Sequence, residues 1–152
     1  MLEKQKARYS YGISGGQFAN YVEKALKSSG DNAKNLITLL ESRLDNVVLR
    51  AGFALTRSAA RQMVNHGHIT VDGKKVTIPS YKVAIGEKVT IREGSRKKAL
   101  FAKLDEELKA VKAPNWMTVD ADLKVIDITS IPTTEKTELL FDVGQVLEFY
   151  TR

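Results

Sequence analysis

The period of the hydrophobic pattern changes at His68, and this change restricts the possible folds more than any other feature of the sequence. Before it, apolar residues recur at helical spacing. After it, the strand-like segments ITV (69–71) and KKVTI (74–78) flank Asp72-Gly73. Asp-Gly is a preferred dipeptide of two-residue β-hairpin turns, whose central residues need positive φ. The sequence therefore predicts a helix that leads directly into an antiparallel hairpin.

Two short helices are predicted just before this hairpin, at roughly 43–51 and 56–66. Thr56 suits the N-cap of the second helix, and Gly67 suits the left-handed residue that ends it. At about 100° per residue, each helix has an apolar stripe that faces a core and a polar stripe on the other side. The polar stripes can share one surface, and their basic residues are Arg43, Arg50, Arg57 and Arg61.

The remainder of the chain completes an α+β pattern. Helical spacing is expected at 17–28, 32–44, 95–113 and 142–152, and strands are expected at 88–93, 116–120 and 124–132. The glycine-rich segment 12–18 matches no phosphate-binding fingerprint and is interpreted as a flexible entry to the first helix. Because 129–138 is linker-like, we expect a helical domain from 1–42 and 138–152, with an inserted domain of antiparallel sheet and helices at 43–137.

Positive charge is concentrated in the middle of the chain. The net charge is +6, and residues 42–98 hold 12 Lys and Arg against 4 Asp and Glu, whereas the remaining 95 residues hold 12 and 14. Such a field attracts phosphates and releases their counterions, which favours a polyanionic partner. A solvated basic surface without a partner is the alternative interpretation.

The composition argues against several other classes of protein. The chain has no cysteine, which excludes disulfides and thiolate metal sites, and no apolar run approaches the roughly 20 residues that cross a bilayer. His66 and His68 form an i, i+2 pair that diverges at a helix end, without further ligands nearby. We therefore expect no metal, no cofactor and no catalysis, and histidines that serve turns, caps or hydrogen bonds to RNA. A soluble cytoplasmic protein is the expectation.

Basic residues beyond the helices extend the predicted surface. The hairpin turn adds Lys74 and Lys75, the segment PSYK (79–82) follows, and further arginines and lysines come after the third strand. The guanidinium group forms a rigid fork of donors that fits phosphate oxygens, while lysine adds charge without fixed geometry. The pattern indicates a surface that follows a phosphate backbone, although arginines that only keep a helix soluble are an alternative.

The segment RLDNVVLRAGFALTRSAARQMVNHGHITVDGKKVTIPSYKVAIGEKVTIRE (43–93) resembles the RNA-binding (alpha-L) motif of the small-subunit ribosomal protein S-four family. EKQKARYSYGI, PNWMTVD and VLEFYTR extend the resemblance to nearly the whole chain, and the motif itself is placed at 43–107. Matching the motif implies RNA contacts by Arg43, Arg50, Thr56, Arg57, Arg61, Gln62, Asn65, His66, His68, Lys74, Lys75, Ser80 and Tyr81. We add Arg92, Arg96 and Lys97 because of their charge.

The resemblance implies a bacterial-type structural protein of the ribosome. Such a protein binds a multi-helix junction of small-subunit ribosomal RNA early and nucleates assembly beside neighbouring ribosomal proteins. Some members also repress their own messenger RNA, and a free monomer is expected. Members usually begin with a further basic segment, so a truncated or naturally short form is expected. Gly15, Gly16 and Ala19 stand where the family tends to place arginines, which predicts a weaker RNA grip by the helical domain.

Two other classes of function share parts of this pattern. Pseudouridine synthases, tyrosyl-tRNA synthetases and heat-shock proteins carry the same motif, but the residues outside 43–93 are too few for a catalytic domain and lack an acid/base constellation. A helix-turn-helix repressor shares the paired helices. The hairpin that follows the second helix, with its lysines, favours RNA over DNA.

Overall fold

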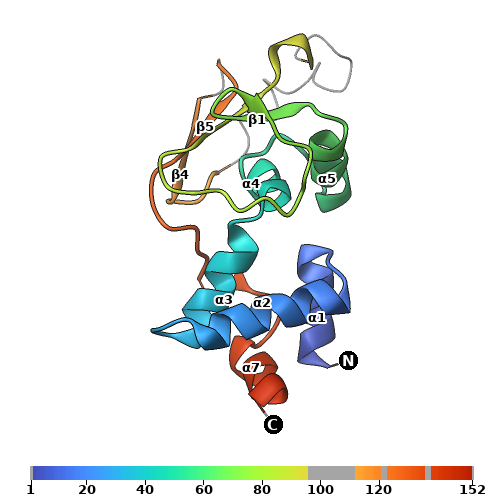
Figure 1. Cartoon of the computed structure of the whole chain (residues 1–152), viewed down its shortest axis with the longest axis vertical. Coiled ribbons are helices and arrows are strands. Elements are labelled where there is room, and N and C mark those ends of the chain that lie inside the picture. Colours follow the sequence, from blue (N-terminus) through green and yellow to red (C-terminus); the bar gives the residue numbers. More distant parts are fainter. Residues whose placement is uncertain (1, 96–111, 121–122, 136–137, 152) are drawn as a thin grey trace. The chain divides into compact units, whose positions relative to one another are not determined.

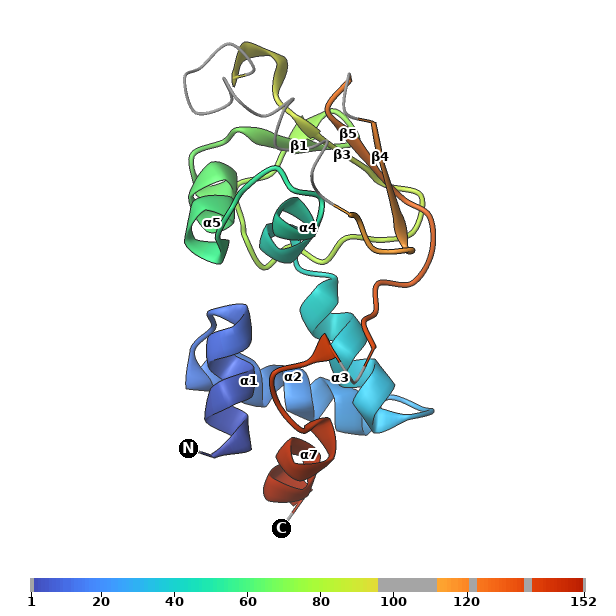
Figure 2. The same ribbon diagram turned by 180° about the vertical axis from the view of Figure 1, so that it is seen from behind.

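Both ends of the chain contribute to one helical unit (Figure 1, Figure 2). The computed structural model describes residues 2–95, 112–120, 123–135 and 138–151, and the chain divides into Met1–Glu41 with Thr133–Arg152, and Ser42–Pro132. Within the helical unit, Glu3 accepts a hydrogen bond from the backbone N–H of Asp142, with 2.7 Å between nitrogen and Oε2. This bond joins residues that lie 139 positions apart in the sequence.

The helical unit buries the apolar stripes that the sequence predicts. Its helices are α1 (Glu3–Tyr11), α2 (Gly15–Lys27), α3 (Asn32–Glu41) and α7 (Val143–Thr151). Phe18 and Val22 from α2 and Leu36 from α3 lie in one core, and Phe141, just before α7, joins them. Near this core, the Tyr11 hydroxyl donates a 2.6 Å hydrogen bond to the buried carboxylate of Glu41.

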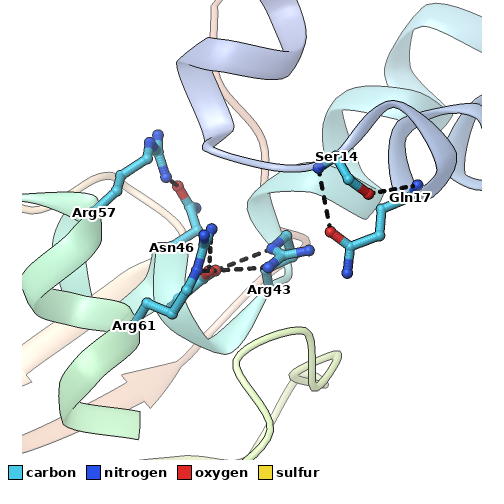
Figure 3. A network of polar contacts seen from close by, with 7 residues as sticks. Ser14, Gln17, Arg43, Asn46, Arg57 and Arg61 are labelled. Carbon is cyan, nitrogen blue, oxygen red and sulfur yellow. Dashed lines mark hydrogen bonds and ion pairs between the residues drawn. The ribbon is translucent and has the colours of Figure 1, made fainter. Parts of the chain in front are cut away.

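The glycine-rich segment 12–18 is an ordered helix boundary, so its interpretation as a flexible entry was wrong. Gly12 ends α1 in the left-handed conformation, with φ of 64°. Ser14 then forms a capping box with Gln17, in which each side chain accepts a hydrogen bond from the other residue's backbone N–H (Figure 3). This reciprocal arrangement satisfies two N–H groups that a helix start would otherwise leave without partners.

The second unit contains a five-stranded antiparallel sheet of order β2-β1-β3-β5-β4. The strands are β1 (Ile69–Val71), β2 (Lys74–Lys75), β3 (Lys88–Ile91), β4 (Met117–Asp120) and β5 (Val125–Ile128). Asp72 and Gly73 connect β1 to β2 with φ of 50° and 83°, as the predicted hairpin turn requires. The α+β class expected from the sequence is therefore confirmed.

Two short helices pack against the sheet, α4 (Leu44–Arg50) and α5 (Arg57–Asn65) (Figure 1). Val47, Val48, Met63 and Val64 lie with the strands in one buried core, which confirms the predicted apolar stripes. A 3-10 turn at Glu93–Ser95 follows β3. The helix expected at 95–113 falls largely outside the described residues.

The segment 79–83 is bound to the start of α4 through the backbone. The N–H groups of Leu44 and Asp45 donate to the carbonyls of Tyr81 and Pro79, with nitrogen–oxygen distances of 2.9 and 3.1 Å, and Val83 donates to Ser42 at 2.9 Å. These bonds satisfy donors at a helix start, which otherwise need a cap or water. The first turn of α4 is therefore fixed between the 79–83 segment and the core.

Candidate nucleic-acid interface

Helix α5 presents the polar face that its sequence predicts. Thr56, Gln62, Asn65 and His66 are exposed, and Arg57 and Arg61 are partly exposed, whereas Ala60, Met63 and Val64 on the other side are buried. The Thr56 hydroxyl accepts a 3.0 Å hydrogen bond from the N–H of Ala59, which confirms the predicted N-cap. The cap and the apolar side fix the orientation of α5, so its polar side faces outward.

Arg43 differs from the prediction of an exposed basic face, because it is buried and paired. Only 3% of the residue is exposed. Its Nε and Nη2 atoms donate to the two carboxylate oxygens of Asp45 at 3.1 and 3.0 Å, a two-bond fork. A buried arginine needs such a partner, because an unpaired charge away from water is costly. The expectation that Arg43 forms part of the exposed surface is therefore wrong.

Two consecutive buried residues of α4 accept hydrogen bonds from two arginines of α5 (Figure 3). Asn46 Oδ1 accepts from Arg57 Nη1 at 2.8 Å. Asp45 Oδ2 accepts from Nε and Nη2 of Arg61 at 3.4 and 3.3 Å, while about a third of the Arg61 side chain (34%) stays exposed. The Asp45 carboxylate therefore accepts hydrogen bonds from both Arg43 and Arg61, and these three side chains together carry one net positive charge.

The end of α5 brings a hairpin lysine next to the helix. Gly67 has φ of 77°, and the N–H groups of Gly67 and His68 each donate at 3.0 Å to carbonyls of the last turn, a Schellman arrangement. The stem of Lys75 passes over this glycine so closely that a Cβ at residue 67 would lie 3.1 Å from Lys75 Cδ. Lys74 and Lys75 are both exposed, and the Lys75 stem lies beside the carboxyl end of α5.

The two histidines have different environments. His66 is exposed at the C-cap of α5, whereas His68 is buried and its Nδ1 lies 2.7 Å from the Ser95 hydroxyl. The prediction of His68 as a surface residue is therefore wrong, since its ring belongs to the interior. Within the described part of the chain, no three His, Asp or Glu side chains gather into a group that could hold a metal ion.

The remaining predicted residues lie at several places around the sheet. Tyr81 is partly buried, and its hydroxyl donates a 2.6 Å hydrogen bond to Glu87. This bond, with burial and the charge of Glu87, raises the pKa of Tyr81 to about 12. Arg92 is exposed after β3, while Arg50 at the end of α4 and Ser80 are partly buried. Arg96 and Lys97 fall outside the described residues.

Asp45 is the functional candidate that the sequence interpretation missed. An acidic residue in the first turn of a helix has an ordinary explanation, since its negative charge interacts favourably with the positive end of the helix dipole and stabilises the helix. Its partner Arg61 is 16 residues away, so no local spacing links the two. The presence of Asp45-Asn46 within an otherwise basic stripe was the available signal.

Comparisons with known proteins identify the family. Residues 42–89 match the S4 domain, and residues 1–41 match the Ribosomal protein S4/S9 N-terminal domain. The small ribosomal subunit protein uS4 of Roseiflexus castenholzii is 46% identical over 155 residues, covering 100% of this chain and 75% of the relative. Small ribosomal subunit protein uS4 of Listeria monocytogenes is 45% identical over 152 residues, covering 99% and 74%.

None of the described helices has the length and apolar character that a bilayer-spanning segment requires. The chain spans about three quarters of the length of these relatives. Two family models account for residues 1–89 without a gap, and the identity extends over the full length of the chain. The chain therefore belongs to the small ribosomal subunit protein uS4 family.

Proposed function

We propose that this protein is a structural component of the small ribosomal subunit and binds its ribosomal RNA through a surface on the second unit. We call this the α5–hairpin surface, and it consists of Thr56, Arg57, Arg61, Gln62, Asn65, His66, Lys74 and Lys75. The observation that carries the proposal is the position of the Lys75 stem over Gly67, which places a basic residue of the hairpin beside the carboxyl end of α5. Family membership supports the partner, because the relatives are small ribosomal subunit proteins.

The chemistry of this surface fits a folded RNA backbone. Guanidinium groups and hydroxyl or amide side chains donate to phosphate oxygens, and the exposed lysines add charge that releases counterions. Folded RNA is recognised largely by shape, phosphate and 2′-hydroxyl contacts, which such a mixed surface supplies. The uS4 family is structural and not enzymatic, so binding without catalysis is the role.

We extend the proposal to the finer role that the family resemblance implies. The protein binds a multi-helix junction early in assembly and contacts neighbouring small-subunit proteins. Binding of messenger RNA belongs to the same proposal, because a surface that reads phosphates accepts a second folded RNA. The free protein is proposed to be a monomer.

The double variant Arg57→Ala with Arg61→Ala tests the surface. We expect weaker binding to naked small-subunit ribosomal RNA, and a slope of log K against log salt that is shallower by roughly 1.4–1.8, since each phosphate contact contributes roughly 0.7–0.9. Lys88→Ala is the control, because Lys88 lies on β3 and pairs with Asp127 at 3.8 Å. An unchanged slope in the double variant would remove both arginines from the interface.

A second experiment separates RNA from DNA as the partner. Nuclease footprinting on naked small-subunit ribosomal RNA, with duplex DNA as competitor, should give one protected region that DNA does not displace. Lys74→Glu with Lys75→Glu should weaken binding to many RNA sequences alike, because phosphate contacts carry no base information. Displacement by duplex DNA would instead support a helix-turn-helix repressor.

A further inference from the structure

We infer that Asp45 is a positioning residue for RNA binding: its buried carboxylate holds the Arg61 guanidinium in the orientation that meets a phosphate. This inference rests on the proposed function, since it concerns an arginine of the α5–hairpin surface. It assigns a favourable role in binding a polyanion to an acidic side chain. If only the net charge mattered, Asp45 would weaken the binding of RNA.

The Asp45 carboxylate is fixed from several directions. Arg43 grips it with two hydrogen bonds of 3.0 and 3.1 Å, and both side chains are only 4% exposed. The backbone N–H of Asp45 donates to the Pro79 carbonyl at 3.1 Å, which ties the residue to the 79–83 segment. A carboxylate held in this way cannot follow the motion of a surface side chain. It therefore acts as a rigid anchor for any donor that reaches it.

Arg61 reaches this anchor from the other helix. Its Nε and Nη2 atoms donate to the same oxygen, Asp45 Oδ2, at 3.4 and 3.3 Å, so this edge of the guanidinium plane is directed inward. With 34% of the side chain exposed, Arg61 lies between the anchor and the solvent. One turn earlier on α5, Arg57 donates a single 2.8 Å hydrogen bond from Nη1 to the side-chain oxygen of Asn46.

Such an arrangement favours binding by reducing the entropy that binding costs. A free arginine samples many rotamers, and ordering one rotamer-rich side chain at an interface weakens affinity. Because Asp45 restricts Arg61 before RNA arrives, that loss occurs during folding. The guanidinium geometry matters here, because its planar fork can address a carboxylate along one edge and a phosphate along another.

Charge and position make opposite predictions for Asp45→Asn. Removal of a negative charge beside a phosphate-binding surface should strengthen binding if charge alone matters. If Asp45 positions Arg61, the neutral amide holds it less firmly, and the affinity for naked small-subunit ribosomal RNA should fall roughly 3- to 10-fold, the equivalent of ordering one side chain. Asp127→Asn on β5 removes an equal charge from the same unit and should not weaken binding.

Arg61→Lys is the second variant, because it keeps the charge and lies on a partly exposed helix face. Lysine has one nitrogen in place of the fork, so the affinity should fall by a similar factor while the salt slope stays nearly unchanged. Asp45→Asn also leaves the buried Arg43 opposite a neutral amide, so its unfolding is followed by the fluorescence of Trp116. If that variant is unfolded, Arg61→Lys decides the question.

The outcomes separate the two proposals. If Arg61→Ala leaves RNA binding unchanged, the α5–hairpin surface is refuted at this residue and the positioning role with it. If Arg61→Ala weakens binding but Asp45→Asn, when folded, strengthens it, or Arg61→Lys leaves the affinity unchanged, the surface stands and positioning is wrong. The inference holds if folded Asp45→Asn weakens binding and has no further effect in an Arg61→Ala background.

Discussion

Replacing Gly67 by alanine should destabilise the second unit by about 1–2 kcal/mol and weaken RNA binding as well. The residue has φ of 77°, a region where an L side chain costs about 1–2 kcal/mol. The new Cβ would also lie 3.1 Å from Lys75 Cδ. Because Lys75 is exposed and flexible, it moves aside at little cost. The loss of stability therefore comes from the strain of an alanine backbone at positive φ. The displaced lysine sets the loss of RNA affinity.

The assay uses Trp116, the single tryptophan of the chain, which is buried in the core of the same unit. Urea unfolding followed by tryptophan fluorescence should show the midpoint lowered by roughly 0.5–1 M, taking a denaturant dependence of about 2 kcal/mol per M. RNA binding is measured on the folded variant under the same buffer conditions. Stability and affinity are then obtained separately.

Gly86→Ala is the matched control for this prediction. Gly86 has φ of 92°, but no heavy atom lies within 4 Å of a Cβ placed there. It should therefore lose a similar amount of stability and keep its RNA affinity. A midpoint for Gly67→Ala equal to that of the wild type would refute the backbone argument. Equal RNA affinity for both variants would show that Lys75 does not depend on Gly67 for its place at the interface.

Three further predictions follow from side-chain contacts. Thr56→Ala should cost about 1 kcal/mol in the same fluorescence assay because the N-cap is lost, and Thr56→Ser should retain most of that stability. Tyr11→Phe should destabilise the helical unit by about 1.5–3 kcal/mol in circular dichroism melting, since its hydroxyl bonds a buried carboxylate, that of Glu41. In an alkaline absorbance titration, the pKa of Tyr81 should be about 12 and should fall towards its ordinary value of about 10 in Glu87→Gln. Because the folded pKa is raised, the stability that this bond contributes is present below about pH 10 and is lost as the pH rises through about 12; an unshifted titration would contradict the bond.

Local chemistry in the sequence was enough to predict most elements of the second unit. Some features depend only on residues within a few positions of each other, and they can be predicted without tertiary structure. They are the Asp72-Gly73 turn, the Thr56 cap and the Gly67 helix end. The segment 12–18 was the exception among local features. Its glycines suggested flexibility, and the capping pair of Ser14 with Gln17 was overlooked.

The polar residues were harder to predict, because a helical wheel gives directions about one axis and does not show what covers them. Arg43 and His68 look exposed by their type and spacing, yet both are buried: Arg43 pairs with Asp45, two positions along the chain, and His68 lies against Ser95, 27 positions away. Asp45 meets Arg61 only because α4 and α5 pack side by side.

The sequence by itself determined the α+β class, the paired helices and hairpin, and the basic character of the second unit. These depend on hydrophobic period, turn chemistry and charge, which short stretches carry in full. Only the tertiary structure decided which charges remain at the surface. Burial depends on which elements pack over a residue, which is a matter of long-range contacts, and a charge is tolerated in the interior only where a partner lies within reach.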